Sequence, residues 1–121
     1  MQRVLETIQK EGKLNNVCSI DLPGPGGANH IYAVSTESIP RRFVQSVVFQ
    51  KGPRTDKNSL TGVTNEDLLE MVRDRLTAFQ SGEMACTENA KALENVENAL
   101  QWLNERTKDR ITRGVLGTMR K

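Results

Sequence analysis

The 121-residue sequence contains few of the residues on which many catalytic and disulfide-bonded proteins depend. It has two cysteines, one histidine and one tryptophan, and aromatic residues make up 4% of it. So few cysteines predict no disulfide framework and favour a reducing cytosol. With one histidine and no CxxC or HxxxH spacing, the sequence predicts no metal site. It has no GxSxG element and no P-loop ending in Lys-Ser or Lys-Thr. We therefore expect a binding protein with no catalytic residues and no cofactor.

Long apolar runs are also absent. No stretch approaches the length of about 18 apolar residues that a membrane span requires. The first residues lack the apolar core of a secretory signal, so we expect a cytoplasmic protein. The length predicts a single domain, residues 1–121, whose small core favours association with a second copy. The net charge of +2 is too small to indicate bulk nucleic-acid binding.

The first half of this domain, residues 1–60, is rich in β-branched residues and holds all four prolines. Residues 17–21, 30–36 and 43–50 have the composition of short strands. Residues 22–29 contain Pro and Gly and predict a loop. Residues 2–10 fit either a short helix or an edge strand. We expect a small antiparallel sheet in this half.

The second half, residues 61–121, predicts two helices. Thr64 and Asp67 have the spacing of a capping box at the start of the first helix. Apolar residues then recur at three- and four-residue steps, at Leu68, Val72, Leu76 and Phe79. Gly82 is placed to end this helix, and Thr87 is placed to cap the next.

The second helix carries a heptad seam that becomes polar at its end. The seam consists of Leu93, Val96, Leu100, Leu103, Thr107 and Arg110. Gly114 is expected to stop this helix. The short connection makes the two helices antiparallel, so the fold class is α+β: a small antiparallel N-terminal sheet and a long C-terminal antiparallel αα-hairpin.

Charge is unevenly distributed along the second helix. Residues 83–105 carry five acidic residues and one lysine, whereas residues 106–121 carry six basic residues and one aspartate. This distribution complements the helix dipole. A concentrated basic end also suits phosphate binding.

Several residues have both a structural and a ligand-binding interpretation. Phe79 is either the last core residue of its helix or a surface on which adenine stacks. Asn89 is either solvated or reads an adenine edge. Arg54 and Arg106 are either ordinary surface cations or ligands of a pyrophosphate, which suits guanidinium groups. His30 and Tyr32 alternate along a strand and are interpreted as sheet residues. Residues 24–27 are glycine-rich, which indicates a turn more than a phosphate cradle.

The order of motifs resembles a known family. The motifs are residues 27–32, 49–53, 62–69, 74–82, 88–93, 99–107 and 110–118. Together they resemble the first-described family of phage Thoeris anti-defence proteins, and the helical half resembles the hairpin domain shared with a phage anti-CBASS sponge. The resemblance covers the chain apart from its first 16 residues.

This resemblance implies a protein that binds glycocyclic ADP-ribose, a cyclic ADP-ribose-type signal, without cleaving it. It also implies homodimers with ligand pockets at the dimer interface. Some members assemble into hexamers that hold cyclic di- or trinucleotides in separate pockets. Carried over by motif, Phe79 stacks on adenine and Asn89 hydrogen-bonds it. Arg106 and Arg54 contact phosphate and ribose, and the backbone of Gly26, Gly27 and Ala28 approaches the ligand closely.

If Asn89 and Arg106 serve one site, helix geometry makes that site intermolecular, independently of the resemblance. Asn89 and Arg106 are 17 residues apart, about 25 Å at 1.5 Å per residue. One copy cannot readily bring both to one small ligand, whereas two copies related by a two-fold axis can. Two alternatives to a signal-binding protein stay open: a hairpin module that binds nucleic acid through its basic end, and an enzyme that degrades the signal with His30 as base.

Overall fold

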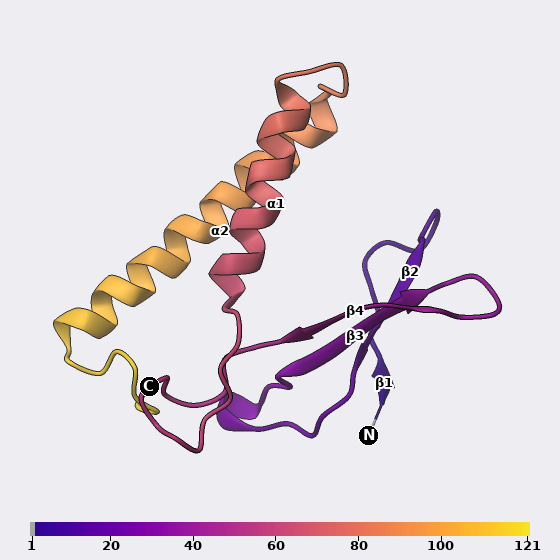
Figure 1. The fold of residues 1–121 in the computed structure, drawn as a ribbon. Helices are drawn as coiled ribbons and strands as arrows, with labels where there is room; N and C mark the ends of the chain where they lie inside the picture. Colours follow the sequence, from indigo (N-terminus) through magenta and orange to yellow (C-terminus); the bar gives the residue numbers. More distant parts are fainter. Residues whose placement is uncertain (1) are drawn as a thin grey trace. The chain divides into compact units, whose positions relative to one another are not determined.

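The computed structural model describes residues 2–121 and divides the chain into two compact units between Val63 and Thr64. The first unit contains four strands and the second contains two helices (Figure 1). This arrangement confirms the predicted α+β class. No helix in the described part of the chain is long and apolar enough to cross a membrane.

The sheet is antiparallel throughout, with strand order β1-β2-β3-β4. Its strands are β1 (Arg3–Val4), β2 (Asn15–Ser19), β3 (Ile31–Thr36) and β4 (Phe43–Val48). β1 is therefore a short edge strand. Of the helix and the edge strand that the sequence allows for residues 2–10, the structure has the edge strand. The end of β2 is the most buried part of the sheet, with Cys18 2% and Ser19 1% exposed.

Four predicted strand boundaries are wrong, and one of them is the start of β3, which is Ile31 instead of residue 30. β2 begins at Asn15, because Asn15 and Asn16 pair with Thr36 and Ser35 of β3 despite their low intrinsic preference for strands. It ends at Ser19, before Asp21. The Asp21 carboxylate accepts the backbone N–H groups of His30, just before β3, and of Ile31, the first residue of β3. β4 ends at Val48. Phe49 instead forms an isolated bridge with Val63, and its ring meets Tyr32 edge-on at 5.6 Å between centroids.

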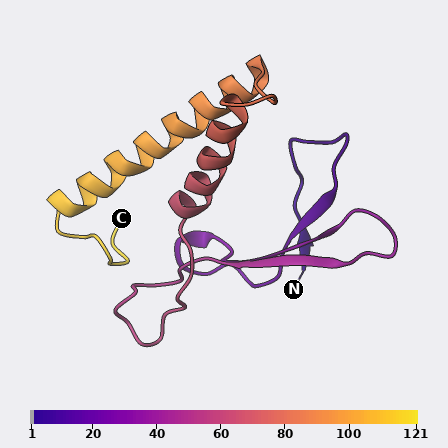
Figure 2. The ribbon, with the colours of Figure 1, turned by 45° about the horizontal axis from the view of Figure 1, so that its top comes forward.

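The helices are α1 (Asn65–Gln80) and α2 (Thr87–Thr112). They lie side by side near the connecting turn and diverge towards their other ends (Figures 1 and 2). The predicted capping box is present: the Thr64 hydroxyl accepts the Asp67 N–H, and the Asp67 carboxylate accepts the Thr64 N–H. The predicted seam is at least half-buried along its whole length, from Leu93 to Arg110.

The connection between the helices differs in detail from the prediction. Cys86, and not Thr87, is the N-cap of α2, and its Sγ accepts the Asn89 N–H at 3.4 Å. Thr87 is the first helical residue. α1 ends at Gln80 with Ser81 as its C-cap. The Gln80 side chain then accepts the Cys86 N–H at 3.0 Å, which ties the end of α1 to the start of α2.

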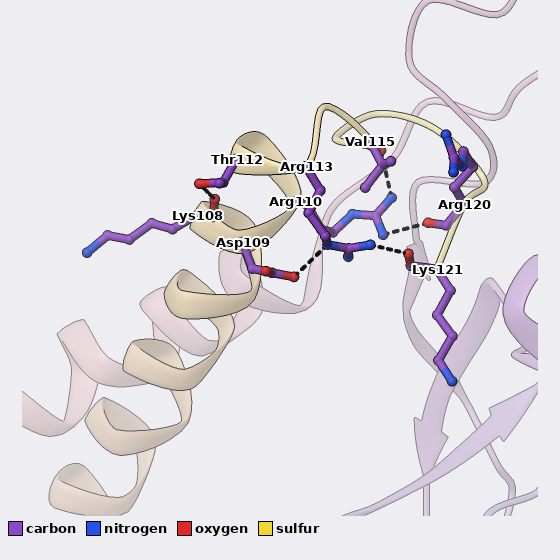
Figure 3. A network of polar contacts seen from close by, with 8 residues as sticks. All are labelled: Lys108, Asp109, Arg110, Thr112, Arg113, Val115, Arg120 and Lys121. Atoms are coloured by element: carbon purple, nitrogen blue, oxygen red, sulfur yellow. Dashed lines mark hydrogen bonds and ion pairs between the residues drawn. The ribbon is translucent and has the colours of Figure 1, made fainter.

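The end of α2 follows the prediction for Gly114, which has φ +71°. The Gly114 N–H donates to Ile111 O and the Val115 N–H donates to Arg110 O, which together form a Schellman motif. This geometry turns the chain back over the helix end. The last seam position, Arg110, is 6% exposed and donates to the carbonyls of Val115 and Arg120 (Figure 3). It also donates to the carbonyl of Thr118. The polar end of the seam therefore holds the C-terminal segment.

Candidate functional site

Phe79 lies in the last turn of α1 and is 37% exposed. It is the last residue of the apolar stripe of α1, and part of its ring is in solvent. The Arg75 guanidinium lies 5.3 Å from the ring centroid, one turn earlier on the same helix. The ring is thus only partly used for packing. Arg75 was not among the predicted site residues, although its i, i+4 spacing from Phe79 was the signal for this contact.

Asn89 lies in the first turn of α2 and is half-buried. Its side-chain Nδ2 donates to Met84 O at 3.1 Å, within the connection between the helices. Its backbone N–H donates to the N-cap Sγ of Cys86. The side chain therefore braces the turn, and its Oδ1 and the second N–H of Nδ2 are left for another group.

Arg106 is exposed on α2, 17 residues after Asn89. Its guanidinium makes no hydrogen bond or ion pair within residues 2–121. Because α2 is one helix from Thr87 to Thr112, the two residues are about 25 Å apart along its axis. The structure brings Phe79 and Asn89 to the same end of the hairpin and leaves Arg106 far from both.

Gly26, Gly27 and Ala28 lie in the loop between β2 and β3. Residues Pro25–Gly27 form a 3-10 turn, and Gly26 and Gly27 have φ +76° and +78°. These positive values explain the glycines locally, because other residues rarely adopt them. A Cβ on either glycine would meet no heavy atom within 4 Å, so the backbone here is open to solvent. Such an open backbone can approach a ligand closely.

Asp21 fixes the base of this loop. Its carboxylate accepts the backbone N–H groups of His30 and Ile31 at 3.0 and 3.2 Å. Asn29 donates to Asp21 as well. Loss of contact with water raises the pKa of Asp21, but these hydrogen bonds outweigh it and hold the pKa below its usual value. The loop carrying the glycines is therefore anchored by a charged group.

Arg54 lies in the exposed segment after β4. Its Nε donates to Gln50 Oε1 at 2.7 Å and its Nη2 donates to Gly62 O at 3.0 Å. These bonds hold the segment between Lys51 and Leu60, which also pair as a bridge. Arg54 thus already has structural partners, in contrast to Arg106. The glycine loop and Arg54 belong to the unit ending at Val63, whereas Phe79, Asn89 and Arg106 belong to the helical unit.

His30, the one histidine, is 8% exposed and lies just before β3. Its Nδ1 is buried and has no hydrogen-bond partner within residues 2–121. The ring packs beneath Gly24, where an added Cβ would lie 3.5 Å from Nδ1. A general base must reach its substrate, and this imidazole is covered by its own loop.

The basic end of α2 is partly used within the chain. Arg110 is occupied by carbonyl groups, and Arg113 donates to Asp109 and to Lys121 O (Figure 3). Lys108 pairs with Glu105 at 3.5 Å. Much of the charge that the sequence concentrates here therefore serves the helix end and the C-terminal segment.

A hollow of about 510 Å³ lies where the two helices diverge. It is lined by Glu66, Glu70, Arg73, Glu97, Leu100, Gln101, Asn104 and Thr107. Arg73 is neutralised by Glu97 at 2.9 Å and by Glu70 at 3.4 Å, and these hydrogen bonds raise its pKa. The remaining acidic charge makes this hollow unsuitable for a phosphate.

The match to a known protein family covers most of the helical hairpin. Residues 44–108 match the family described as Acb2/Tad1, hairpin domain. The chain is also similar to "Thoeris anti-defense 1" of Bacillus phage SBSphiJ7, with 51% identity over 76 residues. That match covers 63% of this chain and 53% of the relative, so the chain spans about half the length of the protein it matches.

Proposed function

Because this chain belongs to the Acb2/Tad1 hairpin-domain family, we propose that it binds glycocyclic ADP-ribose signals without cleaving them and thereby blocks Thoeris immunity. The match to the family covers residues 44–108, more than half of the chain. The observation that carries this proposal is the 51% identity to a Thoeris anti-defence protein. We place this activity in the cytoplasm of an infected bacterium.

The proposed ligand contacts follow from the side chains that the hairpin leaves available. Phe79 offers an exposed part of its ring for adenine, and Asn89 offers Oδ1 to the adenine amino group. The unpaired Arg106 guanidinium suits the pyrophosphate, because planar guanidinium groups bind phosphate through paired hydrogen bonds. Arg54 and the backbone of Gly26, Gly27 and Ala28 are proposed to contact the ribose and phosphate side of the ligand.

Helix length supports a site built from two copies. One copy holds Asn89 and Arg106 about 25 Å apart on a single straight element, farther than one small nucleotide extends. In a two-fold dimer, the hairpin turn of each chain can meet the Arg106 end of the other. We propose a homodimer on this basis, and its assembly into a hexamer that also holds cyclic di- or trinucleotides in separate pockets.

The proposal requires tight binding. A protein that holds a scarce signal below the threshold of its effector needs a Kd of about 1 nM, or about −12 kcal/mol. A stacked base supplies about 1–3 kcal/mol, and charge-assisted bonds to phosphate add to this. A turn already fixed by Asn89, Gln80 and Cys86 lowers the ordering cost of binding.

Isothermal titration with glycocyclic ADP-ribose tests the proposal. We expect tight binding, and we expect the ligand to be recovered intact after the complex is heated. A modified ligand would instead support the degrading enzyme. Titration with cyclic di- and trinucleotides in the presence of bound glycocyclic ADP-ribose tests the separate pockets. Absence of binding to any of these, together with salt-sensitive binding to DNA or RNA, would contradict the proposal.

A further inference from the structure

Trp102 is the single tryptophan of the sequence, and it is 76% exposed. It lies on α2 between two half-buried seam positions, Leu100 and Leu103, of which Leu100 lines the hollow between the two helices. The indole therefore points away from the helix partner. Tryptophan is highly buried on average, and a large exposed aromatic surface is typical of a binding site.

Arg106 lies one turn after Trp102 on the same face of the helix, at the i, i+4 spacing. The other arginines of the two helices all have partners. Arg73 pairs with Glu97, Arg75 lies over Phe79, and Arg110 is bonded to carbonyl groups. Arg106 is thus the exception among helix arginines within residues 2–121. An exposed tryptophan and an arginine without a partner thus occupy neighbouring positions on one face of α2.

The surroundings of the indole are polar. A shallow hollow of about 290 Å³ is lined by Gln101, Trp102, Asn104 and Glu105. The side-chain amides of Gln101 and Asn104 make no hydrogen bond within residues 2–121. The acidic charge of Glu105 is offset by Lys108. The side-chain amide of Asn or Gln can form two hydrogen bonds at once with an edge of adenine.

We infer that Trp102 provides a stacking surface for the base of an anionic purine nucleotide, with Arg106 on its phosphate. This inference rests on the proposed function and adds a ligand contact to the same site. In a site built from two copies, Trp102 and Arg106 come from one chain and Phe79 from the other. The base then has an aromatic ring available on each of its faces.

The single tryptophan gives a direct measurement of this contact. Titration of the wild-type protein with glycocyclic ADP-ribose should quench its intrinsic fluorescence in step with the heat of binding. Trp102→Ala should weaken binding about 10- to 100-fold, the range associated with one stacked base. Trp102→Phe keeps an aromatic face and should stay within about threefold of wild type. Met71→Ala removes another exposed apolar side chain and is the control, expected to bind as wild type does.

Three outcomes would overturn the inference. If the wild-type protein binds but Trp102→Ala binds equally well without any quenching, the inference fails and the proposed function stands. If the wild-type protein does not bind glycocyclic ADP-ribose, both fail. If Trp102→Ala and Trp102→Phe both lower the molar mass in analytical ultracentrifugation together with the affinity, the indole contacts a second copy and not the nucleotide.

Discussion

At the scale of single residues, Asn89 shows how one side chain serves both the fold and the proposed site. The Nδ2 of its amide is bonded to Met84 O, which fixes the orientation of the side chain. Its Oδ1 is thereby held in a known direction for a donor such as the amino group of adenine. An amide held by its own turn loses less freedom on binding than a solvated one.

Phe79→Ala should weaken ligand binding strongly and leave the fold intact. The ring is 37% exposed, so its removal leaves little of a buried cavity, whereas loss of a stacked base should weaken binding about 10- to 100-fold. Isothermal titration and helical circular dichroism measure the two effects. If the variant instead unfolds at a clearly lower temperature and its loss of affinity follows from that instability, Phe79 is a core residue. Leu100→Ala is the control for that case and should lower the melting temperature.

The carboxylate of Asp21 should make stability depend on acid pH. Its folded-state pKa is lowered from 3.8 because hydrogen bonds from the His30 and Ile31 backbone outweigh its loss of contact with water. A lowered pKa means that this stabilisation is fully present above about pH 4 and is lost as the pH falls through the folded-state value.

Thermal unfolding between pH 2 and pH 6 checks this expectation. Asp21→Asn should have a lower melting temperature at pH 6 and a smaller decrease towards pH 2 than the wild type. Asp74→Asn changes an exposed carboxylate on α1 and should keep the wild-type dependence. Parallel curves for the wild type and Asp21→Asn would contradict the assignment.

At the scale of elements, the sequence predicted the hairpin well because its signals are local. The Thr64–Asp67 capping box, the three- and four-residue spacing of the seam and the glycine after α2 act within one or two turns of helix. The strand boundaries were less accurate. The start of β2 at Asn15 depends on pairing with Thr36, 21 positions away, which no local pattern encodes.

The N-cap of α2 and the role of Arg110 show a second reason for the differences. Cys86 and Thr87 both can accept an N–H, and the Gln80 bond to the Cys86 backbone decides which one caps the helix. Arg110 was predicted as part of the seam, but its partners are carbonyl groups of a glycine-containing segment with no periodicity. In both cases the deciding partner lies on another segment.

The candidate site residues were found through family resemblance, since Phe79, Asn89 and Arg106 fit ordinary helix positions equally well.

Arg110→Met should release the C-terminal segment from the end of α2. The substitution leaves the carbonyls of Val115, Thr118 and Arg120 without their guanidinium donor, which should cost about 1–3 kcal/mol in the free energy of unfolding. Hydrogen–deuterium exchange of residues 114–121 should become faster. Arg110→Lys should restore part of the protection, since an ammonium group can still donate. Arg106→Met, on the exposed face of the same helix, should leave the exchange unchanged, and equal exchange in all variants would contradict this role.

At the scale of the whole molecule, the separation of Asn89 and Arg106 along α2 has a consequence for function. If the ligand needs both side chains, each site takes Asn89 from one copy and Arg106 from another. A dimer with a two-fold axis then has two equivalent sites. Each single variant removes one contact from both sites, so Asn89→Ala and Arg106→Ala should each bind poorly alone.

Mixing the two variants distinguishes a shared site from a site within one chain. In a mixed dimer, one site receives both substitutions and the other receives neither, so one of its two sites is intact. Random exchange of subunits makes about half of the dimers mixed, which restores about a quarter of the wild-type ligand capacity at wild-type affinity. Isothermal titration after co-refolding measures this capacity, and each variant refolded alone is the control. If the mixture binds no better than the separate variants, although subunit exchange is shown by mass spectrometry, Asn89 and Arg106 do not meet across a dimer interface.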